Sequence, residues 1–492
     1  MNINHFLRRT LAPVLSALLL LNGCGTGEPA VPDEPAVGQS GEPDGNEATA
    51  VQEAKVPSAD ALSAPKTKEK PLELSLYYDA YNKEYLDALI DSFEDFYPEV
   101  NIVLHDYTDL SAAEAKRQLG EDLQNSTAPD LILDYVNAGY TCIPNTMHLL
   151  DSGEFLPLDR LNLDTSDCSK AVLTCGQYRG TQYFLPLNFS LGCLFTTDSA
   201  MTDLGILDGS RVTLAEFSEK VAQFYGEFPG KYAFRNLFNS NYLYYHDGVS
   251  LFDSRTGELL PEDEVRRTAE EYMGYYEGGL FPDFWTTDYS KATETYGGDA
   301  LKALRAEDLL FYSAPHFIGG LDTLMTFNKT YTELTEAGET PLVFPLPTAD
   351  GGAPRPVMNW YFAVNADTEN TTAVRWFMEN AVHHETQCQI GWYYGLPASD
   401  YALDVIYDFY TEPDTFNRRQ YSSIFPLFGE FSREFVDSYF EPIRKMRETE
   451  FTDSYLVSWI TEYIWQVELG EKTPDEIWDS LWNRVTAYVK GE

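Results

Sequence analysis

The sequence predicts an α/β protein whose folded part is divided into two lobes. Predicted strands and helices alternate where the folded part begins, as in a parallel sheet covered by helices. Residues 71–492 are more than one hydrophobic core usually serves. Aromatic residues make up 14% of the chain and lie almost entirely after residue 76, where they can supply these cores.

The N-terminus has the features of a secretory signal. Arg8 and Arg9 precede an apolar run at 11–21, which is too short to cross a bilayer because a spanning helix needs about 20 apolar residues. With Cys24 at the cut site, the segment resembles a bacterial lipoprotein signal. The resemblance implies removal of residues 1–23 and a lipid on Cys24, which anchors the protein on the extracytoplasmic face of the cell membrane. An ordinary signal with an incidental Cys is the alternative.

The segment from the lipidated Cys24 to residue 70 is predicted to be a disordered linker. Residues 25–70 contain no aromatic residue and are rich in Pro, Gly, Ala, Ser and Glu. Such a composition cannot bury enough apolar area to offset the entropy lost on ordering. As a flexible coil the linker would reach roughly 40 Å, enough to hold a folded domain clear of a membrane.

Charge and cysteine content limit the partners. The net charge of −44 should repel nucleic acid and anionic lipid head groups, so we predict no nucleic-acid partner.

Five cysteines remain after Cys24, and an odd number leaves at least one thiol unpaired. The spacing permits a disulfide between Cys168 and Cys175. It is equally compatible with buried free thiols. The five are Cys142, Cys168, Cys175, Cys193 and Cys388.

The folded part opens with alternating elements. The predicted order is strand 72–78, helix 85–96, strand 100–104, helix 112–123 and strand 129–133. The first helix shows large apolar side chains at the 3.6-residue period and ends before Pro98. The third strand is mostly apolar, as buried parallel strands are. Ligands of such sheets bind at the carboxyl ends of the strands, which are residues 78–81 and 134–135 here.

Two later helices begin with capping boxes. Thr213 is followed by Glu216, and Thr473 by Glu476 with Pro474 at the first helical position. The second helix carries an apolar stripe that we interpret as core packing. Its members are Ile477, Trp478, Leu481, Trp482 and Val485.

Several short motifs follow one another along residues 71–492. They are Pro129-Asp130 before a strand, the Gly and Pro-Leu-Asp of 149–161, residues 178–186 with 192–195, residues 204–216, Pro345-Leu346-Pro347, helix 373–381, residues 395–398 and residues 469–476. In this order they resemble the extracellular solute-binding proteins, the receptor lipoproteins of ABC importers. The resemblance is strongest to the group that includes many sugar binders.

The resemblance implies a two-lobed, periplasmic-binding-protein-like fold with a ligand cleft between the lobes and hinge crossings. The implied boundaries are 71–187 with 346–400 for the first lobe, and 190–343 with 401–492 for the second. Crossings are expected near residues 186–188, residues 344–345 and Pro397. Closure around a ligand would be a hinge motion at such positions.

Sugar binding requires aromatic rings for the apolar faces, and carboxylates or amides for the hydroxyls. The candidates at strand ends and the first crossing are Tyr78, Asp79, Tyr81, Asp134, Tyr135 and Asn188. The resemblance adds Asn239 and Tyr242 in the second lobe, His316 where the family often has a stacking Trp, and Trp360 and Trp392 beside later crossings.

Each candidate also has an ordinary structural interpretation. Aromatic residues beside strand ends belong to the core more often than to a ligand site, and Asp79 and Asp134 can cap turns. Among all of them, Asp79, Asp134, Trp360 and Trp392 are the leading candidates.

Enzyme chemistry has little support in the sequence. We find no zinc-ligand spacing, nucleophile elbow, phosphate loop or dinucleotide fingerprint, so we predict no catalytic residue, metal or cofactor. With 78 acidic residues, no carboxylate pair is informative about glycosidase activity. Residues 253–257 predict a hairpin turn, because Arg255 stands where a calcium loop requires an oxygen ligand.

Two hypotheses follow. The first is a surface-tethered receptor that captures a small solute, with a sugar or oligosaccharide favoured, and delivers it to the permease subunits of an ABC importer. The second is a carbohydrate-active or adhesive lipoprotein, either an enzyme or a polymer binder. A receptor for a non-sugar solute such as a peptide or polyamine is also open. Saturable 1:1 binding without turnover distinguishes a receptor from an enzyme.

Overall fold

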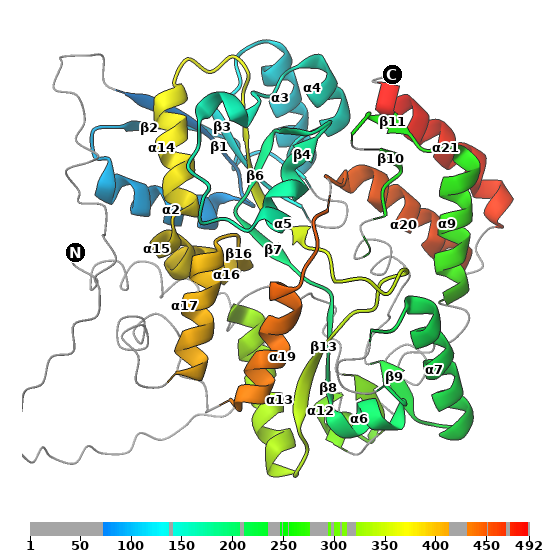
Figure 1. Ribbon diagram of the computed structural model, residues 1–492. Helices are drawn as coiled ribbons and strands as arrows, with labels where there is room; N and C mark the ends of the chain where they lie inside the picture. The colour runs from blue at the N-terminus through cyan, green and yellow to red at the C-terminus, as the bar shows by residue number, and fades with distance from the viewer. Residues whose placement is uncertain are drawn as a thin grey trace, which may run out of the picture. The chain divides into compact units, whose positions relative to one another are not determined.

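The computed structural model separates residues 1–70 from a second compact unit, residues 71–492. Within the second unit the structure describes 72–136, 141–206, 211–234, 247, 249–253, 255–275, 294–296, 300–305, 308–311, 321–412, 431–449, 451–468 and 473–490 (Figure 1). In this described part, no helix combines the length and the apolar character that a membrane span requires.

A five-stranded mixed sheet, in the order β2-β1-β3-β15-β6, lies in the part of the chain that is predicted as the first lobe. Its strands are β1 (Glu73–Tyr78), β2 (Asn101–Asp106), β3 (Leu131–Tyr135), β6 (Phe184–Pro186) and β15 (Trp360–Val364). β1 pairs in parallel with β2 and β3, whereas β15 runs antiparallel to β3 and to β6. The predicted alternation of strands and helices is confirmed, and the carboxyl end of β3 meets the beginning of β15.

Helices cover this sheet. They include α2 (Lys83–Phe96), α3 (Ala112–Gln124), α4 (Thr146–Ser152) and α14 (Thr371–Val382). α2 packs against α14, where the rings of Phe93 and Phe377 lie 5.0 Å apart. α3 begins with a capping box in which Ser111 and Glu114 satisfy each other's backbone amides. The apolar period of the sequence therefore identified the buried face of α2.

Two short pairs of strands lie in the part of the chain that is predicted as the second lobe. β8 (Cys193–Thr197) pairs antiparallel with β13 (Pro341–Pro345), and β9 (Tyr232–Phe234) pairs in parallel with β12 (Leu309–Phe311). Helices α6 (Asp198–Asp203), α7 (Leu214–Glu227), α12 (Ala300–Arg305), α13 (Leu321–Glu336) and α19 (Arg433–Arg444) accompany these strands. α7 starts at the predicted capping box of Thr213 and Glu216. Phe195 stacks on Phe327 with 4.6 Å between ring centroids, which places an aromatic core beneath β8.

Three stretches of chain connect the two groups of strands. β7 (Asn188–Ser190) leads from β6 to β8, residues 346–356 lead from β13 to β14 (Val357–Met358) and β15, and residues 445–453 lead from α19 to α20 (Ser454–Glu468). β7 also pairs with β14 and with β16 (Leu396–Pro397), so the first stretch and the end of the second meet in a small three-stranded sheet. We call 346–356 and 445–453 the crossing segments.

The other described elements complete the unit. They are η2 (Leu158–Leu161), α5 (Lys170–Leu173), η3 (Thr174–Gly176), β4 (Gln177–Tyr178), β5 (Thr181–Gln182), β10 (Phe252–Asp253), β11 (Glu258–Leu259), α9 (Glu262–Tyr275), α15 (His384–Thr386), the π-helical turn η5 (Gln387–Gly391), α16 (Trp392–Tyr394), α17 (Asp400–Thr411) and α21 (Pro474–Lys490). β10 and β11 pair antiparallel, which confirms the predicted hairpin. α21 packs against α20 and against α4 of the first lobe.

The lobe boundaries stay a prediction. Two contacts bear on how they are drawn: α17 packs against α19, and α21 packs against α4.

The cysteines that the structure describes are free thiols. Cys142, Cys168, Cys175 and Cys388 are buried, and Cys193 is partly buried. Of the two alternatives, the structure therefore has free thiols, and Cys168 and Cys175 form no disulfide. Burial raises the pKa of the Cys175 thiol to about 12, which keeps it protonated.

Candidate functional site

The turn after β1 is fixed by Asp79 and Asn82. Asp79 is buried and its carboxylate accepts hydrogen bonds from the hydroxyl of Tyr77 at 3.0 Å and from the backbone amides of Tyr81 and Asn82 at 2.9 and 2.8 Å. The side-chain amide of Asn82 donates to the backbone carbonyl of Leu133 at 3.1 Å, so this turn is attached to β3. Burial raises the pKa of Asp79, although these hydrogen bonds oppose the shift.

Asp134 holds the end of β3 in the same way. Its Oδ1 accepts from the amides of Tyr135 at 2.8 Å and Cys142 at 2.7 Å, and its Oδ2 accepts from the hydroxyls of Tyr361 at 2.6 Å and Thr141. The side chain is only 1% exposed. A ligand hydroxyl would have to displace one of these donors to reach Asp134.

Four aromatic side chains gather at the carboxyl edge of the five-stranded sheet, and we call them the aromatic group: Tyr85, Tyr135, Trp360 and Tyr394. Tyr135 and Trp360 are paired in register across β3 and β15, with ring centroids 4.6 Å apart. Tyr85 of α2 stacks on Tyr394 of α16 at 4.1 Å, and Trp360 meets Tyr85 edge-on at 5.4 Å. Tyr135 and Tyr394 are half-buried, whereas Tyr85 and Trp360 are buried.

Amide side chains lie directly beside the aromatic group. Oδ1 of Asn188 accepts the backbone amide of Trp360 at 3.0 Å, and its Nδ2 donates to the hydroxyl of Tyr85 at 3.4 Å. Oδ1 of Asn359 accepts from Ser190 at 3.0 Å. A Cβ on Gly395 would lie 2.9 Å from Nδ2 of Asn359 and 3.0 Å from Cβ of Asn188, so a glycine is needed for this approach.

The structure brings together only some of the predicted site residues. Asp79, Asp134, Tyr135, Asn188 and Trp360 all lie at one edge of the sheet, which is the arrangement the strand ends predict. Their contact with a ligand stays a prediction.

The other predicted residues lie in different surroundings. Tyr78 is buried and donates to Asp87 at 2.8 Å, and Tyr81 is 56% exposed. Trp392 is 1% exposed and packs in a core with Tyr410, with 5.9 Å between ring centroids, so its ring is not open to a ligand in this arrangement. The positions outside the described residues are Asn239, Tyr242, His316 and Cys24.

The predicted site lacked two members of the aromatic group. In the sequence, Tyr85 belongs to the apolar face of a helix, which predicts core packing, and nothing distinguishes Tyr394 from the aromatic residues beside it. The available signal for Tyr85 was its place in the first turn of the helix that follows β1, because that turn begins at the carboxyl edge of the sheet. Ser190, on the first crossing, carried no such signal.

The described residues contain no group of three or more His, Cys, Asp or Glu side chains that could hold a metal ion. The polar atoms bonded to the aromatic group in the described part are amides and hydroxyls, and the carboxylates of Glu84 and Asp87 lie near Tyr394. Burial raises the pKa of Tyr85 and of Tyr394, so both phenols stay neutral. This arrangement can offer the rings of Tyr135 and Tyr394 for stacking and the side chain of Asn359 for hydrogen bonds to a polar ligand.

Comparisons with known proteins identify the fold. No protein-family model and no curated protein matches the sequence. Among solved structures, the chain is similar to the sugar-binding protein MalE of Xanthomonas citri, with 14% identity over 85% of this chain and 98% of that one and a TM-score of 0.55.

Two further solved structures are similar to the chain over most of its length. An extracellular solute-binding protein family 1 from Alicyclobacillus acidocaldarius has 13% identity over 86% of this chain and 99% of that one, with a TM-score of 0.53. The GacH receptor of Streptomyces glaucescens, solved without ligand and with acarbose, has 17% identity over 86% and 99%, with a TM-score of 0.50. The predicted fold is confirmed: the chain has the two-lobed α/β fold of the extracellular solute-binding proteins.

Proposed function

We propose that the protein is a surface-tethered receptor that captures a sugar or oligosaccharide by closure of its two lobes and delivers it to an ABC importer. The observation that carries the proposal is the aromatic group with its neighbouring amides at the edge of the sheet. Tyr135, Tyr394 and Asn359 are each only partly buried. The fold supports the same conclusion, because the similar structures named above are binding proteins.

The chemistry of the aromatic group suits a sugar. A pyranose ring presents C–H faces that pack on aromatic rings, and hydroxyls that pair with groups able to donate and accept. Asn359 is partly buried and has a donor and an acceptor, and Ser190 fixes the orientation of its amide. Asn188 is fully buried and bonded to Trp360 and Tyr85, so it supports this surface from beneath. Asp79 and Asp134 would act indirectly, because they hold the turn and the strand end from which this surface is built.

The crossings support capture by closure. β7 links the two groups of strands, and Asn188, which contacts both Trp360 and Tyr85, lies on it. A rotation at this crossing would therefore move groups of the site relative to one another. Such hinge closure absorbs the backbone change at a few residues.

A thermal-shift screen tests the proposal. The panel would contain glucose, maltose, maltotriose, cellobiose, acarbose, a tripeptide and spermidine. A ligand at 100 times its dissociation constant stabilises by about 2.7 kcal/mol, which is readily measured as a higher melting temperature. We expect a sugar to give the largest shift and calorimetry to give 1:1 binding.

The same screen separates the alternatives. Product in chromatography after incubation with oligosaccharides would favour the enzyme, and sedimentation with an insoluble polysaccharide but no small-ligand shift would favour the polymer binder. A shift with spermidine or the tripeptide alone would replace the sugar by that solute. No shift with any compound would contradict the receptor proposal.

A further inference from the structure

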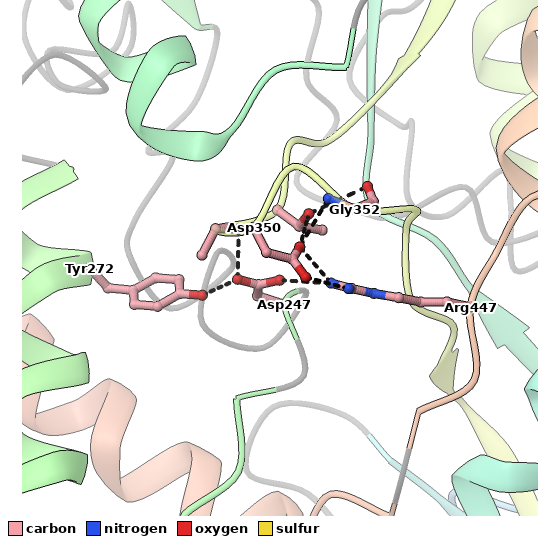
Figure 2. Close-up of polar contacts among 7 residues, drawn as sticks. Asp247, Tyr272, Asp350, Gly352 and Arg447 are labelled. Atoms are coloured by element: carbon pink, nitrogen blue, oxygen red, sulfur yellow. Dashed lines mark hydrogen bonds and ion pairs between the residues drawn. The ribbon is translucent and has the colours of Figure 1, made fainter.

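An ion pair joins the two crossing segments outside the candidate site. Arg447 lies on segment 445–453 and Asp350 on segment 346–356, and we call them the hinge pair (Figure 2). Nη1 of Arg447 lies 2.5 Å from Oδ2 of Asp350, and Nη2 lies 2.9 Å from Oδ1. The backbone amide of Arg447 also donates to the carbonyl of Pro354 at 3.0 Å. A two-pronged pair fixes direction as well as distance, so the segments are held in one relative orientation.

A buried carboxylate attaches the hinge pair to α9. Asp247 is 7% exposed, and its Oδ2 accepts from the hydroxyl of Tyr272 on α9 and from the amide of Ala349 at 2.9 Å. Its Oδ1 lies 3.8 Å from Nη2 of Arg447. A buried carboxylate is costly without a nearby positive charge, and Arg447 supplies one. Figure 2 shows Asp247 between Tyr272 and Arg447, with Asp350 beside the guanidinium.

The turn that carries Asp350 is shaped to receive the guanidinium. Oδ1 of Asp350 accepts from the hydroxyl of Thr348 and from the amide of Gly352, both at 2.9 Å. A Cβ on Gly352 would lie 2.6 Å from Nη1 and 2.9 Å from Cζ of Arg447. Glycine at this position therefore leaves the space that the hinge pair occupies. The pair also holds the pKa of Asp350 well below its usual range, so the carboxylate stays charged at neutral pH.

We propose that the hinge pair, together with Asp247, sets the resting balance between the open and closed arrangements of the lobes and thereby the affinity for ligand. Closure changes the backbone of the segments that cross between lobes, and segments that are paired must change together. Without the pair each segment can change separately, so more conformations must be lost when the lobes close. The effect on affinity rests on the proposed function, whereas the effect on lobe motion does not.

Two variants break the pair in different ways. Arg447→Met removes the charge, and Gly352→Ala keeps every charge but places a methyl group where the guanidinium lies. The matched controls are Arg266→Met and Gly226→Ala. Arg266 pairs with Asp475 between α9 and α21 at 2.5 Å, away from the crossing segments, and a Cβ on Gly226 in α7 would meet open space.

Lobe motion is measured on the full chain without ligand. Spin labels on cysteines introduced at two exposed positions, Asp91→Cys in α2 and Glu219→Cys in α7, report the distance between the lobes by pulsed electron resonance. The native thiols that the structure describes are mostly buried, and the unsubstituted protein serves as the labelling blank. Calorimetry with maltotriose then measures affinity in the same variants.

We expect both hinge variants to shift or broaden the distance distribution and both controls to match the wild type. Where maltotriose binds, the hinge variants should bind it about 5-fold or more weakly, the lower end of typical coupling between sites. Folded variants with a wild-type distance distribution would overturn the inference, even if their melting temperature fell. If the wild type does not bind maltotriose, the distances still decide the role of the pair, and the ligand panel decides the proposed function separately. If Arg447→Met fails to fold because Asp247 loses its compensating charge, Gly352→Ala decides.

Discussion

Tyr135 and Tyr394 are the members of the aromatic group that retain exposed surface. Each is backed by a buried ring: Trp360 lies 4.6 Å from Tyr135, and Tyr85 stacks 4.1 Å from Tyr394. The buried rings fix the orientation of the exposed ones, so less side-chain freedom is lost when a ligand stacks on them. The exposed tyrosines should therefore contribute to affinity, and the buried rings should contribute mainly to their placement.

Replacing either exposed tyrosine tests this division. Tyr135→Leu and Tyr394→Leu keep apolar volume but remove the ring, and a loss of about 1–2 kcal/mol corresponds to roughly 5- to 30-fold weaker sugar binding. The control is Tyr401→Leu on α17, where the side chain is 53% exposed. Calorimetry with the best sugar of the panel gives the comparison, and wild-type affinity in both variants would place the site elsewhere.

Asp453 is a buried carboxylate whose protonation should affect stability. Its Oδ1 accepts from the amides of Tyr455 and Leu456 at 2.9 and 3.1 Å, and its Oδ2 accepts from the hydroxyl of Tyr488 at 2.8 Å. Burial raises the pKa of Asp453 to about 6, although these hydrogen bonds and the positive charge of Lys116 oppose the shift. An unfolded aspartate has a pKa of about 4, so the folded protein binds this proton more tightly.

The sign of the pH dependence follows. The stability due to this proton is fully present below about pH 4 and is lost as the pH rises through about 6, a loss on the order of 3 kcal/mol. Asp453→Asn should remove this dependence. The difference in free energy of unfolding, variant minus wild type, should therefore increase between pH 4.5 and pH 7.5. Urea titrations at several pH values measure the difference, and parallel curves for the two proteins would contradict a raised pKa at Asp453.

The positions of Asp79 and Asp134 could be predicted from the sequence, but not their hydrogen-bond partners. A carboxylate after a buried strand predicts the edge of a sheet, and both residues lie there. The donors that occupy Asp134 include Thr141 and Tyr361, which arrive from other segments, and local sequence does not indicate such contacts. Trp392 could not be placed for the same reason, because its burial depends on α17 packing around it.

Among the elements, local signals predicted what local physics determines. The apolar period predicted α2, and the capping boxes predicted the starts of α7 and α21, where Thr473 and Glu476 pair as expected. The order of strands could not be read in this way. β15 enters the sheet between β3 and β6 from a position far along the chain, and nothing in its own residues specifies those neighbours.

The junction of β16 with β7 makes a testable link between an element and the site. Gly395 lies just before β16, and an added Cβ would press on Asn188 and Asn359. Gly395→Ala should therefore cost about 1–3 kcal/mol of stability by overpacking and should weaken sugar binding by moving these amides. Gly226→Ala is the control, because it adds a methyl group to a helix in open space and should slightly stabilise. Equal melting temperatures and affinities in the two variants would contradict the close approach.

For the molecule as a whole, the negative charge and the length of the predicted tether together determine how the folded part would stand relative to a membrane. The chain carries a net charge of −44, so a membrane surface with anionic lipids would repel it. Such repulsion falls off over a Debye length of about 8 Å at physiological salt, whereas a linker over residues 25–70 would reach roughly 40 Å. A tether of this length would let an acidic receptor stay near the membrane without being pressed against it.

The tether itself rests on Cys24. If this residue carries the lipid, Cys24→Ser should release the protein into the medium or leave it unprocessed, because a serine cannot form the thioether. Fractionation of cells with an antibody against the folded unit measures the distribution. A processed Cys24→Ser protein that still requires detergent for extraction would contradict the lipid anchor.

The linker should have no part in ligand capture. The composition of 25–70 lacks the apolar residues that packing on a lobe would need. Deleting 25–70 from a version without the signal and the lipid should therefore leave the melting temperature and the sugar affinity unchanged within error. A large fall in melting temperature would show that the segment packs on the folded unit. A change in affinity alone would show that it contacts the ligand or the crossing segments, and either result would replace the tether by a structural role.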